Sequence, residues 1–139
     1  MNKNVRISIS GLHSNDEETS DVVSNSTGTY LYKEGKHYVC FEELSQDGMD
    51  YSKSILKLHP DMIELIRRGV GGTHLYFEPG KLNNTYYNTV VGNIFIGVNT
   101  KYMDLQVSDK VITARIEYEL VMNEDKVSDC VVEIEIVSL

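Results

Sequence analysis

Residues 112–138 alternate between apolar and polar side chains on both sides of a short polar turn, and this pattern restricts the fold more than any other part of the sequence. The apolar positions are Ile112, Ala114, Ile116, Tyr118, Leu120 and Met122 before the turn, and Cys130, Val132, Ile134 and Ile136 after it. Period-two alternation is typical of antiparallel strands with one buried face. We therefore expect a hairpin in which 112–122 pairs with 128–138 across a turn at 123–126.

The length of these two strands suggests how the sheet is completed. Each run covers about eleven residues, or roughly 35 Å at ~3.3 Å per residue. Most strands are about half as long, and long twisted strands fit most easily into a sheet that closes on itself. Short alternating segments also recur through the rest of the chain, without a βαβ pattern or an internal repeat. The sequence predicts an all-β fold, a single antiparallel meander barrel of about eight to ten strands over 1–139.

Residues 60–69 form a segment whose pattern fits both a helix and a strand. Pro60 near its start, two arginines near its end and Gly69 after them would suit a short helix. The neighbouring segments, however, are strands joined by short turns, and ten residues is little for an isolated helix. We predict a strand.

Composition restricts the partners and the cellular compartment. A chain of 139 residues with 41% hydrophobic content can bury a core of its own. Its net charge of −8 repels phosphate backbones and anionic membranes, so we expect no nucleic-acid and no membrane partner. No segment resembles a signal peptide or spans a bilayer, so we expect a cytoplasmic protein. Cys40 and Cys130 lie in apolar strand patterns, which predicts two reduced core thiols.

Motifs that would identify a catalytic or metal centre are missing. The four histidines have no metal-ligand spacing, and there is no Cys-x-x-Cys pair. No serine lies in a nucleophile elbow. The acidic run 14–21 lacks the regular oxygen spacing of a calcium loop, so we interpret it as a solvated connection. We expect no metal and no cofactor, and we rank an enzyme behind the two functions given below.

Five short motifs are spaced along the chain. They are Phe41-Glu42-Glu43, Arg67-Arg68-Gly69, Phe77-Glu78-Pro79-Gly80, Tyr87-Asn88-Thr89-Val90-Val91-Gly92 and Ile116-Glu117-Tyr118-Glu119-Leu120. In order and spacing they resemble the YwiB-like family of small bacterial proteins, over nearly the whole chain. The resemblance implies a calycin-like barrel, similar to lipocalins or streptavidin, and no established activity. The function must therefore be argued from the residues.

Some residues of these motifs are candidates for binding a ligand. They are Glu42, Glu43, Arg67, Arg68, Tyr87, Thr89 and Tyr118. Adjacent strand residues face opposite sides, so we expect one glutamate and one arginine to point into the barrel and to pair there. The glycines that follow Arg68 could instead form an anion-binding nest. The tyrosines and the threonine could line a pocket, or the tyrosines could simply fill the core.

Two functions compete on this basis. The first is a non-catalytic module that binds a small molecule in the barrel. The alternative is a protein-interaction or assembly domain whose acidic outer sheet face meets a basic partner. That face carries Glu117, Glu119, Glu133 and Glu135. A filled interior favours the second function, and a cavity with convergent polar groups favours the first. The sequence leaves the ligand and the oligomeric state open, including a homo-oligomer.

Overall fold

The computed structural model describes residues 1–11, 23–44, 51–68, 72–89 and 91–139, and they form ten β-strands. In chain order the strands are β1 (Asn4–Ser10), β2 (Val23–Lys33), β3 (Lys36–Leu44), β4 (Tyr51–Leu58), β5 (Ile63–Arg67), β6 (Thr73–Phe77), β7 (Leu82–Thr89), β8 (Gly92–Val107), β9 (Val111–Met122) and β10 (Asp125–Ser138). Over these ranges no residue is helical, so none forms a helix that is long and apolar enough to cross a membrane. The predicted all-β class is confirmed.

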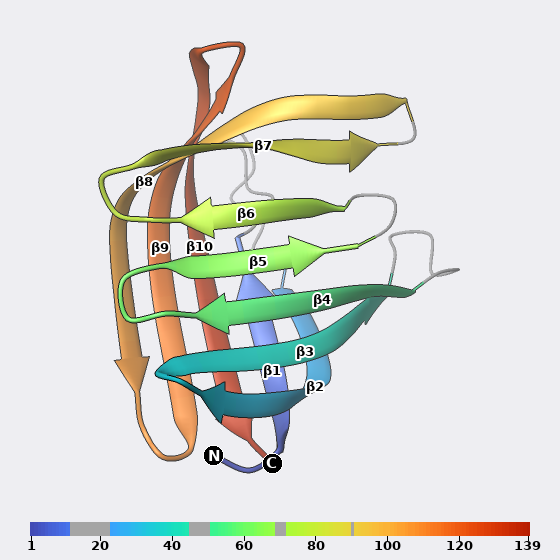
Figure 1. The fold of residues 1–139 in the computed structure, drawn as a ribbon, viewed down its shortest axis with the longest axis vertical. Coiled ribbons are helices and arrows are strands. Elements are labelled where there is room, and N and C mark those ends of the chain that lie inside the picture. The colour runs from blue at the N-terminus through green and yellow to red at the C-terminus, as the bar shows by residue number, and fades with distance from the viewer. Residues whose placement is uncertain (12–22, 45–50, 69–71, 90) are drawn as a thin grey trace.

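All ten strands belong to one antiparallel sheet with the order β6-β5-β4-β3-β2-β1-β10-β9-β8-β7. Each strand pairs with its neighbour in the sequence, as in the predicted meander, except that β6 does not pair with β7. The first and last strands pair with each other instead, from Val5 opposite Ser138 to Ser10 opposite Glu133. The two chain ends therefore lie side by side (Figure 1).

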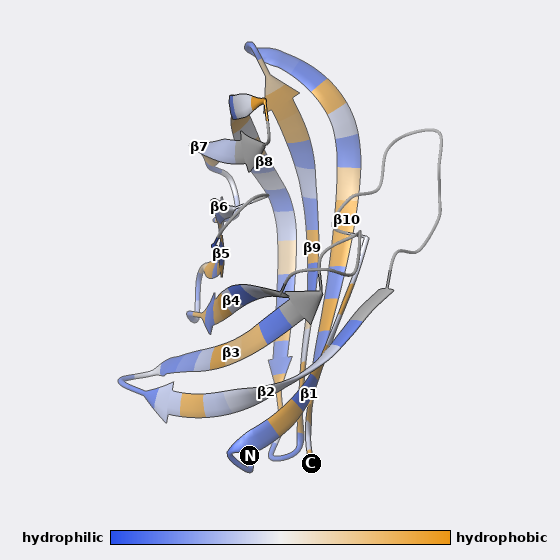
Figure 2. Ribbon diagram, turned by 90° about the vertical axis from the view of Figure 1, so that its right-hand side faces the viewer, coloured by the Kyte–Doolittle hydropathy of each residue, from blue (hydrophilic) through white to orange (hydrophobic). Residues whose placement is uncertain are grey.

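The sheet folds over into two layers whose strands cross at a steep angle (Figure 1). Strands β3 to β7 form one layer, and β1, β9 and β10 form the other, which Figure 2 shows from the side. Strand β8 belongs to both layers, because its first part pairs with β7 and its second part with β9. A register shift between Thr100 and Tyr102 marks the bend, as β-bulges commonly do.

The barrel is nearly closed, and its seam lies between β6 and β7. Within the described ranges these two strands share no ladder pairing. The Thr73 hydroxyl crosses the seam and donates to the Tyr86 carbonyl oxygen at 3.0 Å. At the other end of β6, the Gly80 amide donates to the Thr100 carbonyl oxygen at 2.9 Å, and the Thr100 amide donates to that of Lys81 at 3.2 Å.

The predicted C-terminal hairpin is confirmed, but its turn is shorter than the predicted 123–126, because Asp125 and Lys126 already belong to β10. Tyr118 lies opposite Cys130, and Ile116 lies opposite Val132. The turn between β9 and β10 contains Asn123 and Glu124, with φ angles of 52° and 68°, as expected for the tight turns that suit twisted hairpins. Hydrophilic and hydrophobic bands alternate along β9 and β10 in Figure 2. Their apolar side chains join a continuous core with those of the opposite layer.

Two expectations from the sequence have clear outcomes here. The segment 60–69 contains strand β5, so the predicted strand is confirmed. The prediction of two core cysteines is wrong for Cys40, which is exposed, and right for Cys130, which is buried. Val39 and Phe41 are buried, so the intervening side chain of Cys40 must point outward. The acidic run 14–21 and the glycines 69 and 71 lie outside the described residues.

Candidate functional site

Two of the seven candidate residues lie on the outer surface. Glu42 is exposed on β3, where it stands opposite Lys53 of β4. Arg68 is exposed just after β5, and its backbone amide donates to the Lys53 carbonyl oxygen at 3.1 Å. Neither side chain enters the barrel, so these two residues do not form the expected interior pair.

Glu43 and Arg67, which are adjacent to Glu42 and Arg68 in the sequence, remain as the two candidates for the interior pair. Glu43 is paired with Ser52 in the backbone register of β3 and β4, and Thr89 is paired with Gly92 at the end of β7. The side chains of Glu43 and Thr89 lie outside the described part of the structure. An ion pair between Glu43 and Arg67 therefore stays a prediction.

Arg67 belongs to a polar row on the inner face of the first layer. Its backbone register places it opposite Ser54 of β4 on one side and Thr73 of β6 on the other. Ser54 and Thr73 are both buried, and Arg67 is partly buried. The row lies where β5 ends and β6 begins, whereas β4 continues beyond Ser54 to Tyr51.

A second polar row faces inward from the other layer. Thr100 of β8 lies opposite Tyr118 of β9, and Tyr118 lies opposite Cys130 of β10. All three side chains are buried. The thiol of Cys130 is 3.4 Å from the hydroxyl of Ser128, which is also buried. We call Ser54, Arg67, Thr73, Thr100, Tyr118 and Cys130 the inner polar rows.

The two rows come together at Tyr118. Burial raises the pKa of its phenol, and the neighbouring Cys130 raises it further. The positive charge of Arg67 acts in the opposite direction, which shows that the guanidinium lies within electrostatic reach of the phenol. The Tyr118 ring also packs edge-on against Phe77, with ring centroids 5.2 Å apart. Tyr118 is therefore a neutral hydroxyl group at physiological pH.

Thr100 is a member of the inner rows that the sequence did not single out. Its side chain is fully buried, and its hydroxyl oxygen has no hydrogen-bond partner among the described residues. Most buried polar groups in proteins are hydrogen-bonded, so such a hydroxyl needs an explanation. Tyr87, by contrast, is partly buried on β7 and packs against the apolar core, which agrees with a packing role.

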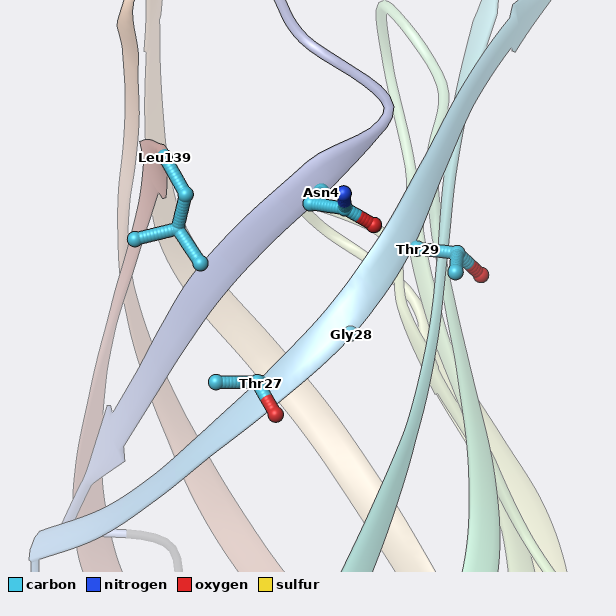
Figure 3. Close-up of a pocket in the computed structure, with 5 residues that line it drawn as sticks. All are labelled: Asn4, Thr27, Gly28, Thr29 and Leu139. Atoms are coloured by element: carbon cyan, nitrogen blue, oxygen red, sulfur yellow. The ribbon is translucent and has the colours of Figure 1, made fainter.

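An open recess of about 530 Å³ lies on the surface where β1 and β2 pair. It is lined by Asn4, Thr27, Gly28, Thr29 and Leu139. Figure 3 shows the side chains of this group spread around Gly28. The recess has hydroxyl groups but no charged side chain in its lining, and none of the candidate residues from the sequence reaches it.

A second recess, of about 370 Å³, lies on the outer face of the other layer, in the acidic region predicted to meet a basic partner. Three of the four glutamates of that region form ion pairs within the sheet. The pairs are Arg115–Glu117 (3.6 Å), Arg115–Glu133 (2.5 Å), Lys101–Glu119 (3.5 Å) and Lys126–Glu119 (3.4 Å). These cations neutralise much of the negative charge that was expected to attract a basic partner.

An ionic cluster that the sequence did not indicate lies on the outer face of β4 to β6. The Glu64 carboxylate is 3.1 Å from His59 Nε2 and 3.5 Å from His74 Nε2. Burial acts to raise the pKa of Glu64. The hydrogen bond and charge of His59, with the charges of His74 and Lys57, outweigh burial and hold that pKa below its usual value. Over the described ranges, no three metal-ligating side chains are placed to hold an ion.

The fold and the inner polar rows define the chain as a small, nearly closed, antiparallel β-barrel protein. The family model of a domain of unknown function, DUF1934, matches residues 7–134, and the chain belongs to this family. The crystal structure of the YwiB protein from Bacillus subtilis has the same fold, with a TM-score of 0.83. The two chains are 17% identical, and the match covers 99% of this chain and 92% of that one. The predicted YwiB-like resemblance is confirmed. No curated protein sequence matches the chain.

Proposed function

We propose that the protein is a non-catalytic module that binds a small anionic molecule at the inner polar rows. The observation that carries this proposal is the position of Arg67, a partly buried cation that shares an inner row with the buried hydroxyl residues Ser54 and Thr73. A partly buried guanidinium is a common way to recognise a carboxylate or a phosphate.

The opposite layer adds donors of the same kind. The Tyr118 phenol is protonated at neutral pH, as an ordinary tyrosine is, and an anion could accept its hydrogen bond in exchange for its present interaction with Cys130. The buried hydroxyl of Thr100, beside Tyr118 in the sheet, is a further donor. Both properties suit binding rather than catalysis, because a phenol whose pKa is raised is a poor general base at neutral pH.

Three finer features are part of the same proposal. We expect the barrel to be calycin-like, because it is a nearly closed antiparallel meander. We expect it to act in the cytoplasm, because no disulfide joins Cys40 and Cys130. We also expect Glu43 to balance the charge of Arg67 when no ligand is bound, since a charge inside a barrel needs a partner.

The acidic-face alternative has less support. Its outer glutamates are mostly paired with cations of the same sheet. Exposed pairs of this kind contribute little to stability, about 0–1 kcal/mol each, so a basic partner could still displace them. The binding free energy of such a partner would, however, include only the difference between the ion pairs that it breaks and the ion pairs that it forms. The inner polar rows offer a more specific arrangement.

Thermal unfolding in the presence of candidate anions tests the proposal. The probes are inorganic phosphate, citrate and a nucleoside monophosphate, with a neutral polyol as the ligand control. A ligand present at about 100 times its Kd stabilises the folded state by roughly 2.7 kcal/mol. For a domain of this size we expect a rise in Tm of roughly 8 °C, at ~3 °C per kcal/mol.

Arg67→Met and Arg68→Met form a matched pair of variants, because the two arginines are adjacent but face opposite sides of the sheet. Arg67 also makes other contacts in the folded protein. The variant is therefore judged by its response to the probe and not by its own Tm. We expect wild type and Arg68→Met to respond and Arg67→Met not to respond. The proposal fails if no probe raises the Tm of wild type, or if Arg67→Met responds equally.

A further inference from the structure

Two histidines approach one carboxylate on the outer face of β4 to β6. His59 directly follows β4 and reaches Glu64 of β5 from one side, and His74 of β6 reaches it from the other. The side chains of His59 and Glu64 are only 14% and 12% exposed. We call these three residues the histidine cluster. Its net charge is negative when both imidazoles are neutral and positive when both are protonated.

Each ring nitrogen of His74 faces an oxygen atom. Nδ1 is 3.2 Å from the Tyr76 hydroxyl, and the two rings stack with centroids 4.0 Å apart. Nε2 is buried, has no hydrogen-bond partner among the described residues, and is 3.5 Å from Glu64 Oε1. A neutral imidazole has a single N–H, whereas the imidazolium has two. Only the charged form of His74 therefore directs an N–H toward each of these oxygens.

The two imidazoles are the groups of this surface that respond to pH near neutrality. Histidine is the side chain that ordinarily changes its charge between about pH 5 and about pH 8. The other ionisable side chains next to the cluster, along or across the strands, are Lys36, Tyr38, Lys57, Asp61, Arg68, Tyr76, Glu78 and Tyr86. None of them belongs to this residue type, so a change of charge here reports the cluster itself.

The histidine cluster lies directly behind the inner polar rows. Arg67 is three residues after Glu64 on β5, and Thr73 immediately precedes His74 on β6. Arg67 and Thr73 are opposite each other on the inner face, so His74 occupies the reverse side of the same two strands. The separation across one sheet layer is roughly 10 Å. At this distance and an effective dielectric of about 20, a unit charge changes an equilibrium constant by roughly tenfold before salt screening.

We propose that the histidine cluster regulates anion binding at the inner polar rows, so that the anion binds more tightly when His59 and His74 are protonated. This inference rests on the proposed function. Protonation changes the charge behind Arg67 from negative to positive, and a positive charge attracts an anion bound on the other face of the sheet. Because binding equilibria are reciprocal, a bound anion must favour the protonated histidines to the same extent.

Isothermal titration calorimetry of the full chain with inorganic sulfate tests this proposal. Sulfate keeps its charge between about pH 8 and about pH 5.5, the range in which an imidazole titrates. At constant ionic strength we expect sulfate to bind wild type at least about threefold more tightly at the acid end. The double variant His59→Gln/His74→Gln should lose this difference, and circular dichroism checks that it keeps its β-sheet spectrum.

His37→Gln is the matched control. His37 lies at the start of β3, where its ring contacts the Tyr30 hydroxyl rather than the cluster. This variant should keep the pH dependence of wild type. NMR titration of the wild-type imidazoles adds a readout that needs no variant. With sulfate bound, His59 and His74 should keep their protons to higher pH, whereas His37 should titrate as it does without sulfate.

The outcomes separate this inference from the proposed function. Sulfate that binds equally tightly at both pH values overturns the inference and leaves the proposed anion site standing. A pH dependence that survives in the double variant does the same, because other groups would then cause it. Absence of sulfate binding at both pH values also overturns the inference, and the proposed function is then decided by the Tm response to its own probes.

Discussion

Replacement of Ile116 by alanine tests the two-faced character of the sheet most directly. Ile116 is fully buried in the middle of β9, between Val132 of β10 and Met103 of β8. The substitution removes three carbon atoms, which at about 0.8 kcal/mol each costs ~2.4 kcal/mol in lost burial. A residual cavity adds to this cost, so we expect a total loss of about 2–5 kcal/mol.

Urea unfolding followed by circular dichroism measures this loss, and Glu117→Ala is the matched control on the next residue of the same strand. Glu117 points outward, and its contact with Arg115 at 3.6 Å is between half-exposed side chains. Surface changes of this kind usually stay within ~0.5 kcal/mol. Equal losses for both variants would show that β9 is covered on both faces and would refute the assignment of inner and outer sides.

Two further predictions concern ionisable groups. In the native protein a maleimide reagent should label the exposed Cys40 rapidly and the buried Cys130 only after unfolding; equal rates would contradict the assigned faces. The Glu64 carboxyl has a folded pKa below its unfolded value of about 4.3. Its ionisation therefore contributes stability above that pH, and the contribution is lost as the pH falls through the folded pKa. Urea titrations of wild type and Glu64→Gln should thus give a stability difference that shrinks between neutral and acid pH, whereas a constant difference would show that ionised Glu64 is not stabilised.

The architecture was predictable where one side of a strand is buried. Alternation fixes the face of every residue in β9 and β10, because a slip of one residue would turn the apolar side chains outward. The same rule fails at β8. Its bulge inserts a residue after Thr100, so the inward positions change phase between Val98 and Met103. The sequence pattern therefore breaks into two segments, although the backbone continues as a single strand.

The error at Cys40 has a related cause. The residue lies in a run of apolar side chains, and such a run hides which positions face inward. Only the pairing of β3 with β4, where Cys40 is opposite Ile55 and Phe41 is opposite Ser54, separates the two faces. Exposed apolar residues are common on protein surfaces, so a hydrophobic run alone cannot place a thiol in the core.

The candidate site was predictable in its chemistry but not in its full membership. Strand alternation required that only one of Arg67 and Arg68 face inward, and the structure shows that it is Arg67. Thr100 was missed because it lies at the bulge, where the pattern has no clear phase. The cluster around Glu64 was missed because His59 and His74 are far apart in sequence. Strand pairing brings them to the same carboxylate.

The seam of the barrel connects the fold to the proposed site. Thr73 belongs to the same inner row as Arg67, and its hydroxyl also makes the hydrogen bond that joins β6 to Tyr86 of β7. The neighbouring strand pairs of the sheet are held by ladders of backbone hydrogen bonds, so the seam is a weak boundary of the barrel and a natural place for local opening. An anion held by Arg67 would lie beside this bond and would stabilise the closed state of the seam. Ligand binding and barrel closure would then be coupled through Thr73, because a ligand that favours one of two states shifts their equilibrium by its difference in affinity.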